Sequence, residues 1–140
     1  ADELDVLCLW EGLGYYSRAR SIHQTAQILV QAYQGELPAD PAALQSLPGI
    51  GPYTVGSISS IAFGNPVIAM DGNVRRVYSR LRNVEAPLKS KESESELRAI
   101  AEAFLQTPTV RRSVGDFLEG LMDLGATVCV PSAPRCEECP

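Results

Sequence analysis

The sequence predicts an all-α protein, and three observations support this. Apolar residues recur at spacings of three and four along several stretches, as on the buried face of a helix. No stretch alternates apolar and polar residues for long enough to indicate a half-buried strand. Glycine and proline stand between the periodic stretches, where they end helices. The 140 residues, 45% of them hydrophobic, suffice for one domain or one domain with two lobes.

Two helices are expected in the first quarter of the chain. Residues 2–10 predict a helical segment with Leu4, Leu7 and Cys8 facing inward, and we interpret Cys8 as a small core residue. Glycines at 12 and 14 break this segment. Residues 17–34 predict a longer helix, which Gly35 ends. Its inward positions are Ile22, Ala26, Leu29 and Tyr33.

A helix, a tight turn and a second helix follow. Asp40 before Pro41 is typical of an N-cap and a first helical residue, so a short helix is expected over 41–46. The turn reads Leu-Pro-Gly-Ile-Gly-Pro at 47–52, and the second helix is expected over 53–63, before Gly64. Together these residues predict a helix-hairpin-helix.

Three further helices complete the prediction. Residues 73–82 place Val74, Val77, Tyr78 and Leu81 on one face. Ser93 and Glu96 have the spacing of a capping box and begin a helix that ends before Pro108. A last helix is expected over 113–124, stopped by Gly125.

The charge of the chain is unevenly distributed. The net charge of −5 does not itself indicate nucleic-acid binding. Between residues 71 and 91, however, six residues are basic and two are acidic. The basic residues are Arg75, Arg76, Arg80, Arg82, Lys89 and Lys91. This cluster is either a solvated helix face or, because it adjoins the hairpin, a stripe that faces phosphates. No apolar run reaches about 18 residues, so no membrane span is expected.

The hairpin turn has the composition of a phosphate site. Gly49 and Gly51 permit left-handed backbone angles and leave no side chain in the way. Backbone N–H groups around Ile50 and the first turn of the next helix can then point outward together, where the helix dipole favours an anion. An ordinary turn between two helices would also explain the pattern.

Asp71 has two compatible interpretations. It stands just before a helix, where its carboxylate would accept a hydrogen bond as an N-cap. A carboxylate held ionised in this way would also stabilise the oxocarbenium-like state that forms when a glycosidic bond breaks.

The chain resembles the helix-hairpin-helix DNA glycosylases, and most closely the MutY-type adenine glycosylases. The resemblance lies in the order of the hairpin, a helix, a short apolar connector, Asp71 and a basic helix. The resemblance includes Gly-Leu-Gly-Tyr-Tyr-Ser-Arg at 12–18 and Phe-Leu-Glu-Gly-Leu-Met-Asp-Leu-Gly at 117–125. It implies two helical lobes and a C-terminal iron–sulfur loop. Residues 1–65 would be part of a six-helix lobe carrying the hairpin (41–63). Residues 66–140 would be part of the cluster lobe, with the loop at 129–140. We expect an internal fragment of a longer protein.

The resemblance also implies roles for individual residues. Asp71 and Asn73 would be catalytic, and Tyr53 stands where bifunctional relatives carry a lysine that forms a Schiff base, so hydrolysis without strand cleavage is expected. Tyr15 would wedge into the duplex, Gly49, Ile50, Gly51 and Arg75 would bind DNA, and Glu119 would contact the extruded adenine. Without the resemblance, Tyr15 is a core aromatic, Tyr53 a half-buried helix residue and Glu119 a surface glutamate.

The last cysteines have a specific spacing. Cys129, Cys136 and Cys139 resemble the first three ligands of the family's loop, which holds a 4Fe–4S cluster with a fourth cysteine. Zinc also suits three closely spaced cysteines, whereas disulfides do not suit a chain without export signals.

The resemblance therefore implies a monofunctional base-excision glycosylase that hydrolyses adenine mispaired with 8-oxoguanine or guanine in double-stranded DNA. The general acid of the family is a glutamate upstream of these residues, so the fragment alone is expected to be inactive. A monomer is expected, in the cytoplasm with the nucleoid of a bacterium, or in the nucleus or mitochondrion of a eukaryote. The alternatives are an endonuclease III-like glycosylase and lyase acting on oxidised pyrimidines, and a non-catalytic helix-hairpin-helix module that binds DNA.

Overall fold

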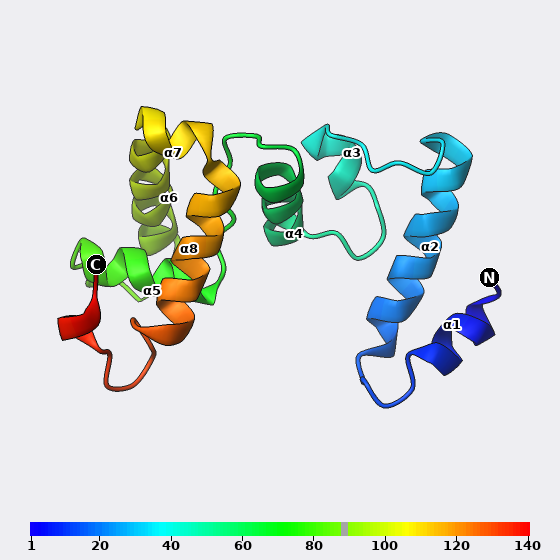
Figure 1. The fold of residues 1–140 in the computed structure, drawn as a ribbon, viewed down its shortest axis with the longest axis horizontal. Helices are drawn as coiled ribbons and strands as arrows, with labels where there is room; N and C mark the ends of the chain where they lie inside the picture. Colours follow the sequence, from blue (N-terminus) through cyan, green and yellow to red (C-terminus); the bar gives the residue numbers. More distant parts are fainter. Residues whose placement is uncertain (88–89) are drawn as a thin grey trace. The chain divides into compact units, whose positions relative to one another are not determined.

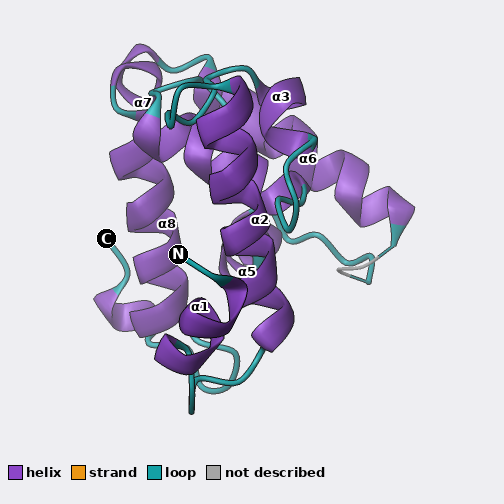
Figure 2. Cartoon of the chain, turned by 90° about the vertical axis from the view of Figure 1, so that its right-hand side faces the viewer, coloured by secondary structure: helices purple, strands orange, loops and turns teal. Residues whose placement is uncertain are grey.

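The computed structural model describes residues 1–87 and 90–140, which form helices and turns with no strand (Figures 1 and 2). The all-α prediction is confirmed. The helices are α1 (Glu3–Leu9), α2 (Tyr16–Ala32), α3 (Pro41–Gln45), α4 (Pro52–Ser57), α5 (Gly72–Leu81), α6 (Lys91–Leu105), α7 (Pro108–Arg112) and α8 (Val114–Thr127). A π-helical turn, η1 (Ile58–Ala62), continues α4, and a 3₁₀ turn, η2 (Cys136–Glu138), lies near the C-terminus.

The chain forms two compact units, residues 1–55 and 56–140. The boundary falls within α4, on the second helix of the hairpin. The division into family lobes at residue 65 stays a prediction. Lys89 of the basic cluster lies outside the described residues. Within the described ranges, no helix is long and apolar enough to cross a membrane.

In the first unit, α1 packs against α2, and a short loop joins the two helices. Ala19 of α2 is fully buried, and Arg20 forms an ion pair with Glu3 of α1 at 3.3 Å. The expected inward face of the first helix was wrong at Leu4 and Cys8, whereas Leu7 is partly buried. Leu4 is 68% exposed and Cys8 is also exposed, so Cys8 is not a core residue.

The hairpin turn is fastened to α2. Gly49 has a φ of 75°, as expected, and a Cβ at this position would lie 2.6 Å from Cβ of Ser21. The hydroxyl of Thr25 donates to the carbonyl of Pro48 at 3.0 Å. The left-handed backbone expected at Gly51 was wrong: its φ is not positive, because the helical backbone of α4 begins directly after it. The N-cap at Asp40 is confirmed, since its carboxylate accepts from the backbone N–H of Ala43 at 2.8 Å.

The second helix of the hairpin changes its winding in the second unit. Instead of one α-helix over 53–63, α4 is followed by the π-helical turn η1. The hydroxyl of Ser60 donates to the carbonyl of Gly56 at 2.8 Å, which competes for the acceptors of the helix backbone. Gly115 of α8 lies against this turn, where a Cβ would approach the carbonyl oxygen of Ser60 to 3.1 Å.

The core of the second unit lies between α5, α6 and α8. Buried side chains come from all three helices and from the connector before α5: Ile68, Ala69, Val74, Val77, Tyr78, Leu97, Ile100, Ala101, Leu118 and Leu121. The ring of Tyr78 stacks on Phe104, with centroids 5.5 Å apart, and Phe104 packs on Phe117 at 5.4 Å. Aromatic pairs in this distance range add packing energy beyond their buried area.

Two details of the predicted helices were wrong, and the break at Pro108 is confirmed. The N-cap of α6 is Ser90 and not Ser93: the Ser90 hydroxyl accepts from the N–H of Ser93, while the Ser93 hydroxyl is buried and donates to the carbonyl of Pro87 at 2.8 Å. Leu81 is 59% exposed, because it lies at the end of α5, beyond the core. The break at Pro108 is real, but Pro108 itself begins the short helix α7.

Gly125 does not stop the last helix. It is buried within α8, which continues to Thr127. A Cβ at Gly125 would lie 2.6 Å from Cβ of Asn73 and 3.1 Å from its Cα. The missing side chain therefore lets α8 approach the first turn of α5, and packing rather than helix termination explains this glycine.

Gly125→Ala is expected to destabilise the protein by about 1–3 kcal/mol, because the added methyl group meets the backbone of α5 and this overpacking outweighs the better helix propensity of alanine. The matched control is Gly120→Ala on the same helix, where a Cβ meets nothing within 4 Å. There alanine should stabilise by about 0.5–1 kcal/mol. Urea unfolding followed by circular dichroism measures both. Equal effects of the two substitutions would contradict the close contact.

Candidate functional site

Asp71 is the N-cap of α5, as predicted. Its Oδ1 accepts from the backbone N–H of Val74 at 2.7 Å, and its backbone is extended, as an N-cap requires. The residue is partly buried. The helix therefore fixes one carboxylate oxygen and leaves the second for another partner.

That partner is Asn73, and Arg76 holds it in turn. The side-chain amide of Asn73 donates to Oδ2 of Asp71 at 3.2 Å. Its amide oxygen accepts from Nη2 of Arg76 at 2.8 Å, so the orientation of the amide group is determined. Arg76 also donates to the carbonyls of Gly125 at 2.6 Å and Cys129 at 2.7 Å. The structure thus brings Asp71 and Asn73 together and connects them to the end of α8.

Arg75 lies beside this group but faces α6. It forms an ion pair with Glu94 and donates from Nε to the carbonyl of Met70 at 3.2 Å. Arg98 pairs with the same carboxylate at 3.0 Å. Arg75, Arg76 and Arg80 all bind groups of the protein, so these residues do not form a free basic stripe. Phosphate binding by Arg75 stays a prediction, and it would have to compete with Glu94.

In the first unit, Tyr15 projects from a loop with an unusual backbone. Gly12, Gly14 and Tyr15 all have positive φ, and Tyr15 is the N-cap of α2 with φ 48°. Its side chain is 79% exposed, so the interpretation as a core aromatic is wrong. The indole N–H of Trp10 donates to the carbonyl of Gly14 at 2.9 Å, and the guanidinium of Arg18 lies over the Tyr15 ring at 5.6 Å. These two contacts hold an exposed aromatic ring in place.

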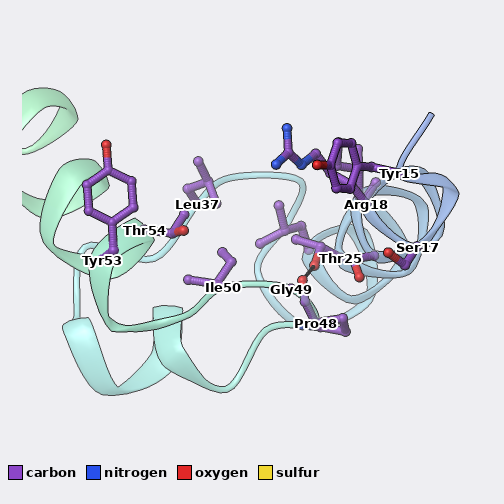
Figure 3. Close-up of a pocket in the computed structure, with 14 residues that line it drawn as sticks. Tyr15, Ser17, Arg18, Thr25, Leu37, Pro48, Gly49, Ile50, Tyr53 and Thr54 are labelled. Atoms are coloured by element: carbon purple, nitrogen blue, oxygen red, sulfur yellow. Dashed lines mark hydrogen bonds between the residues drawn. The ribbon is translucent and has the colours of Figure 1, made fainter. Parts of the chain in front are cut away.

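Tyr15 shares an open cavity with the hairpin. The cavity has a volume of about 840 Å³ and lies between α2 and the segment from Pro48 to Thr54 (Figure 3). Its lining includes Tyr15, Gly49, Ile50 and Tyr53, which are four of the predicted site residues. Tyr53 is 44% exposed on α4. A Cβ at Gly51 would meet nothing within 4 Å, so the backbone there is open to a ligand.

Glu119 lies on the exposed face of α8 in the second unit. Among the residues that the structure describes, no hydrogen bond or ion pair joins its carboxylate to Asp71 or Asn73. Its predicted role in base recognition stays a prediction.

The three C-terminal cysteines do not form a metal site as they are placed. Cys129 is partly buried and follows α8, whereas Cys136 and Cys139 are exposed at either end of η2. Within 1–87 and 90–140, no group of three cysteine, histidine or carboxylate side chains is arranged to hold a metal ion. Thiolates are the correct donors for an iron–sulfur cluster or zinc, but their arrangement here does not fit either group.

The sequence analysis does not predict the roles of two residues at these sites, Arg76 and Trp10. Arg76 appears there only as one of six basic residues, although its spacing of three from Asn73 places both on one helix face. No residue type in the sequence indicates the hydrogen bond of Trp10, because its acceptor is a backbone carbonyl, that of Gly14.

Comparisons with known proteins agree on a family. A family model described as HhH-GPD superfamily base excision DNA repair protein matches residues 1–103. The adenine DNA glycosylase of Buchnera aphidicola subsp. Acyrthosiphon pisum is 40% identical over 136 residues, which are 97% of this chain and 38% of the relative. The adenine DNA glycosylase of Homo sapiens is 42% identical over 133 residues, 94% of this chain and 24% of the relative. The chain thus spans well under half the length of these relatives.

Solved structures give the same fold. A thermostable thymine-DNA glycosylase matches with a TM-score of 0.80 and 28% identity, covering 99% of this chain and 62% of that one. A trapped covalent intermediate of endonuclease III with DNA matches with a TM-score of 0.71 and 28% identity, covering 100% and 62%. The expected helix-hairpin-helix glycosylase fold is confirmed.

The ion pair between Arg75 and Glu94 predicts a pH dependence of stability. The hydrogen bond from Arg75, helped by the charges of Arg75 and Arg98, keeps the pKa of Glu94 below its ordinary value of 4.5. Its stabilisation is therefore fully present above pH 4.5 and is lost as the pH falls through the lowered pKa. Glu94→Gln should lower the free energy of unfolding by at most about 1 kcal/mol at pH 7, and by less in acid.

The control for this substitution is Glu96→Gln, an exposed position on the same helix. Urea unfolding of the wild type and both variants from pH 7 down to pH 3 measures the effect. A difference between wild type and Glu94→Gln that stays constant over this range would show that the ion pair does not contribute.

Proposed function

Because the chain belongs to the HhH-GPD superfamily of base excision DNA repair proteins, we propose that it is part of an adenine DNA glycosylase. Its reaction would be hydrolysis of the N-glycosidic bond of adenine mispaired with 8-oxoguanine or guanine. Similarity to adenine glycosylases over nearly the whole chain supports the substrate class. The chemistry rests on one observation, the carboxylate of Asp71 fixed between a helix N-terminus and Asn73.

Asp71 would act on the sugar. When the bond to the base breaks, positive charge develops on the anomeric carbon and the ring oxygen. An ionised carboxylate whose position is already fixed stabilises that charge without reorganisation in the transition state. The backbone N–H of Val74 and the amide of Asn73 would hold Asp71 in this orientation. Protonation of the departing base needs a second group, and we assign it to none of these 140 residues.

The first unit would bind double-stranded DNA. The backbone at Gly49, Ile50 and Gly51 would receive a phosphate, because the turn is fixed to α2 and unobstructed at Gly51. Tyr15 would enter the duplex beside the mispair, since its ring is exposed and already oriented by Arg18. Endonuclease III, a structural neighbour, has been solved in complexes with DNA.

An endonuclease III-like activity on oxidised pyrimidines is the second candidate, because two neighbouring structures are endonuclease III complexes and one is a trapped covalent intermediate. A Schiff-base intermediate with the sugar requires an amine nucleophile. This chain has Tyr53 at the position assigned to that amine, and a phenol cannot form an imine. Tyr53 therefore favours hydrolysis alone.

No step is assigned to a 4Fe–4S cluster, since the three cysteines are not assembled to hold one.

Asp71→Asn should reduce adenine release by roughly 10²-fold or more, because the neutral amide cannot stabilise the developing charge. Asparagine caps helices as well as aspartate does, so folding should be preserved. The assay uses the full natural protein that carries these residues, with duplexes containing adenine opposite 8-oxoguanine, adenine opposite guanine, or an oxidised pyrimidine. Asp123→Asn, an exposed position on α8, is the control.

Three outcomes of this assay differ in meaning. Release of adenine that Asp71→Asn abolishes supports the proposal. Release of the pyrimidine would establish the second candidate instead. Binding of duplex DNA with no base release from any substrate would identify a non-catalytic binding module.

Tyr53 predicts that no covalent adduct forms. Borohydride treatment of the reacting complex should trap essentially no protein on DNA, and strands should break only after alkali, because no imine is present to reduce. Endonuclease III treated in parallel is the positive control. An adduct in high yield would contradict the monofunctional reaction while leaving glycosylase activity intact.

A further inference from the structure

Trp10 closes the loop between α1 and α2 at both of its ends. Its backbone N–H donates to the carbonyl of Val6 at 3.1 Å and so completes the last turn of α1. Its carbonyl accepts from the N–H of Leu13 at 3.2 Å, and its indole N–H donates to the carbonyl of Gly14 at 2.9 Å. One residue at the end of α1 therefore binds the part of the loop that directly precedes α2.

The loop leads into a residue with an unfavourable backbone conformation. Tyr15 has φ 48° and ψ 49°, in the left-handed region that a residue with a Cβ rarely adopts. Gly14 before it also has a positive φ, of 68°. A strained conformation of this kind persists only where surrounding contacts determine it, and such residues concentrate at functional sites. The contacts around Tyr15 therefore carry information about its role.

Those contacts reach Tyr15 from two sides. On the α2 side, its carbonyl accepts from the N–H of Arg18 at 2.8 Å, and the Arg18 guanidinium lies over its ring (Figure 3). On the α1 side, the indole of Trp10 holds the carbonyl of Gly14. Trp10 is half-buried, and a hydrogen bond shielded from water is stronger than one in open solvent.

Burial does not hold the ring of Tyr15, which is 79% exposed. Its position depends instead on the conformation of the backbone that carries it. A ring that is ordered before DNA arrives loses less conformational freedom when it enters a duplex, and this preorganisation increases affinity.

We propose that Trp10 is a positioning residue for Tyr15. Its indole N–H holds the Gly14 carbonyl and thereby keeps Tyr15 in the left-handed conformation that presents the ring to a mispair. The inference rests on the proposed function, in which Tyr15 enters the duplex. Trp10 then contributes to discrimination between mispaired and paired DNA, whereas the phosphate contacts proposed for the hairpin carry no such information.

Trp10→Phe in the full natural protein tests the positioning role without DNA, because it keeps an aromatic ring and removes the N–H donor. Backbone order parameters from ¹⁵N relaxation should be about 0.85 at Gly14 and Tyr15 in the wild type and fall below about 0.6 in the variant. The matched control is Tyr33→Phe at the C-cap of α2, which also removes one polar atom from an aromatic side chain and should change neither value. An unchanged order parameter at Tyr15 in folded Trp10→Phe would overturn the proposal.

DNA binding tests the consequence for specificity. Affinities are measured for a duplex with adenine opposite 8-oxoguanine and for a fully paired duplex, in the Asp71→Asn background to prevent hydrolysis. Trp10→Phe should lower the ratio of the two affinities by about threefold to tenfold, the range of one hydrogen bond. The affinity for paired DNA should stay within about twofold of the wild type. A merely structural role would weaken binding to both duplexes equally and leave the ratio unchanged, which would overturn the proposal.

The two measurements separate this inference from the proposed function. A wild type that binds both duplexes equally would contradict the role of Tyr15 at a mispair, while the order parameters would still decide whether Trp10 positions it.

Circular dichroism establishes whether Trp10→Phe is folded. If it is not, the wild type decides the question. The indole N–H of Trp10 should exchange with solvent at least about tenfold more slowly than that of free tryptophan, because it is hydrogen-bonded and half-buried. Exchange as fast as in free tryptophan, or a Tyr15 order parameter below about 0.6 in the wild type, would overturn the proposal.

Discussion

The close approach of α5 and α8 at Gly125 is the contact on which the second unit depends. A glycine at this position lets the backbone of α8 reach the first turn of α5, where Asn73 lies. The carbonyl of Gly125 then comes within hydrogen-bond distance of Arg76. Any larger side chain would push the two helices apart and move that acceptor away from Arg76. The hydrogen bond therefore depends on the close packing of the helices.

The orientation of the Asp71 carboxylate depends on the same contact. Its own helix fixes one carboxylate oxygen, and Asn73 binds the other. Asn73 is oriented by Arg76, which in turn is oriented by carbonyls at the end of α8 and at Cys129. The Asp71 carboxylate therefore has a single orientation. It is fixed by contacts within α5, at Gly125 of α8 and at Cys129 after α8.

The sequence predicted what local rules determine. Helical periodicity, the caps at Asp40 and Asp71 and the turn at Gly49 depend on neighbouring residues, and each appears in the structure. The errors lie where distant residues decide. Gly125 has the sequence signal of a helix stop, yet its partner is Asn73 on another helix. Ser93 fits a capping box, but its hydroxyl is buried against the carbonyl of Pro87. The interpretation of the basic cluster rests on its charge and its position beside the hairpin, whereas the acceptors that engage it lie up to 53 residues away in the sequence.

The loop that carries Tyr15 has a consequence for spectroscopy. Trp10 is the single tryptophan of the chain, and its indole N–H binds the carbonyl of Gly14, the residue directly before Tyr15. The indole is thus an intrinsic fluorophore attached to a loop whose backbone is left-handed at Gly12, Gly14 and Tyr15. Its emission reports the hydration and geometry of that loop without any label, and no other tryptophan of the chain contributes to the signal.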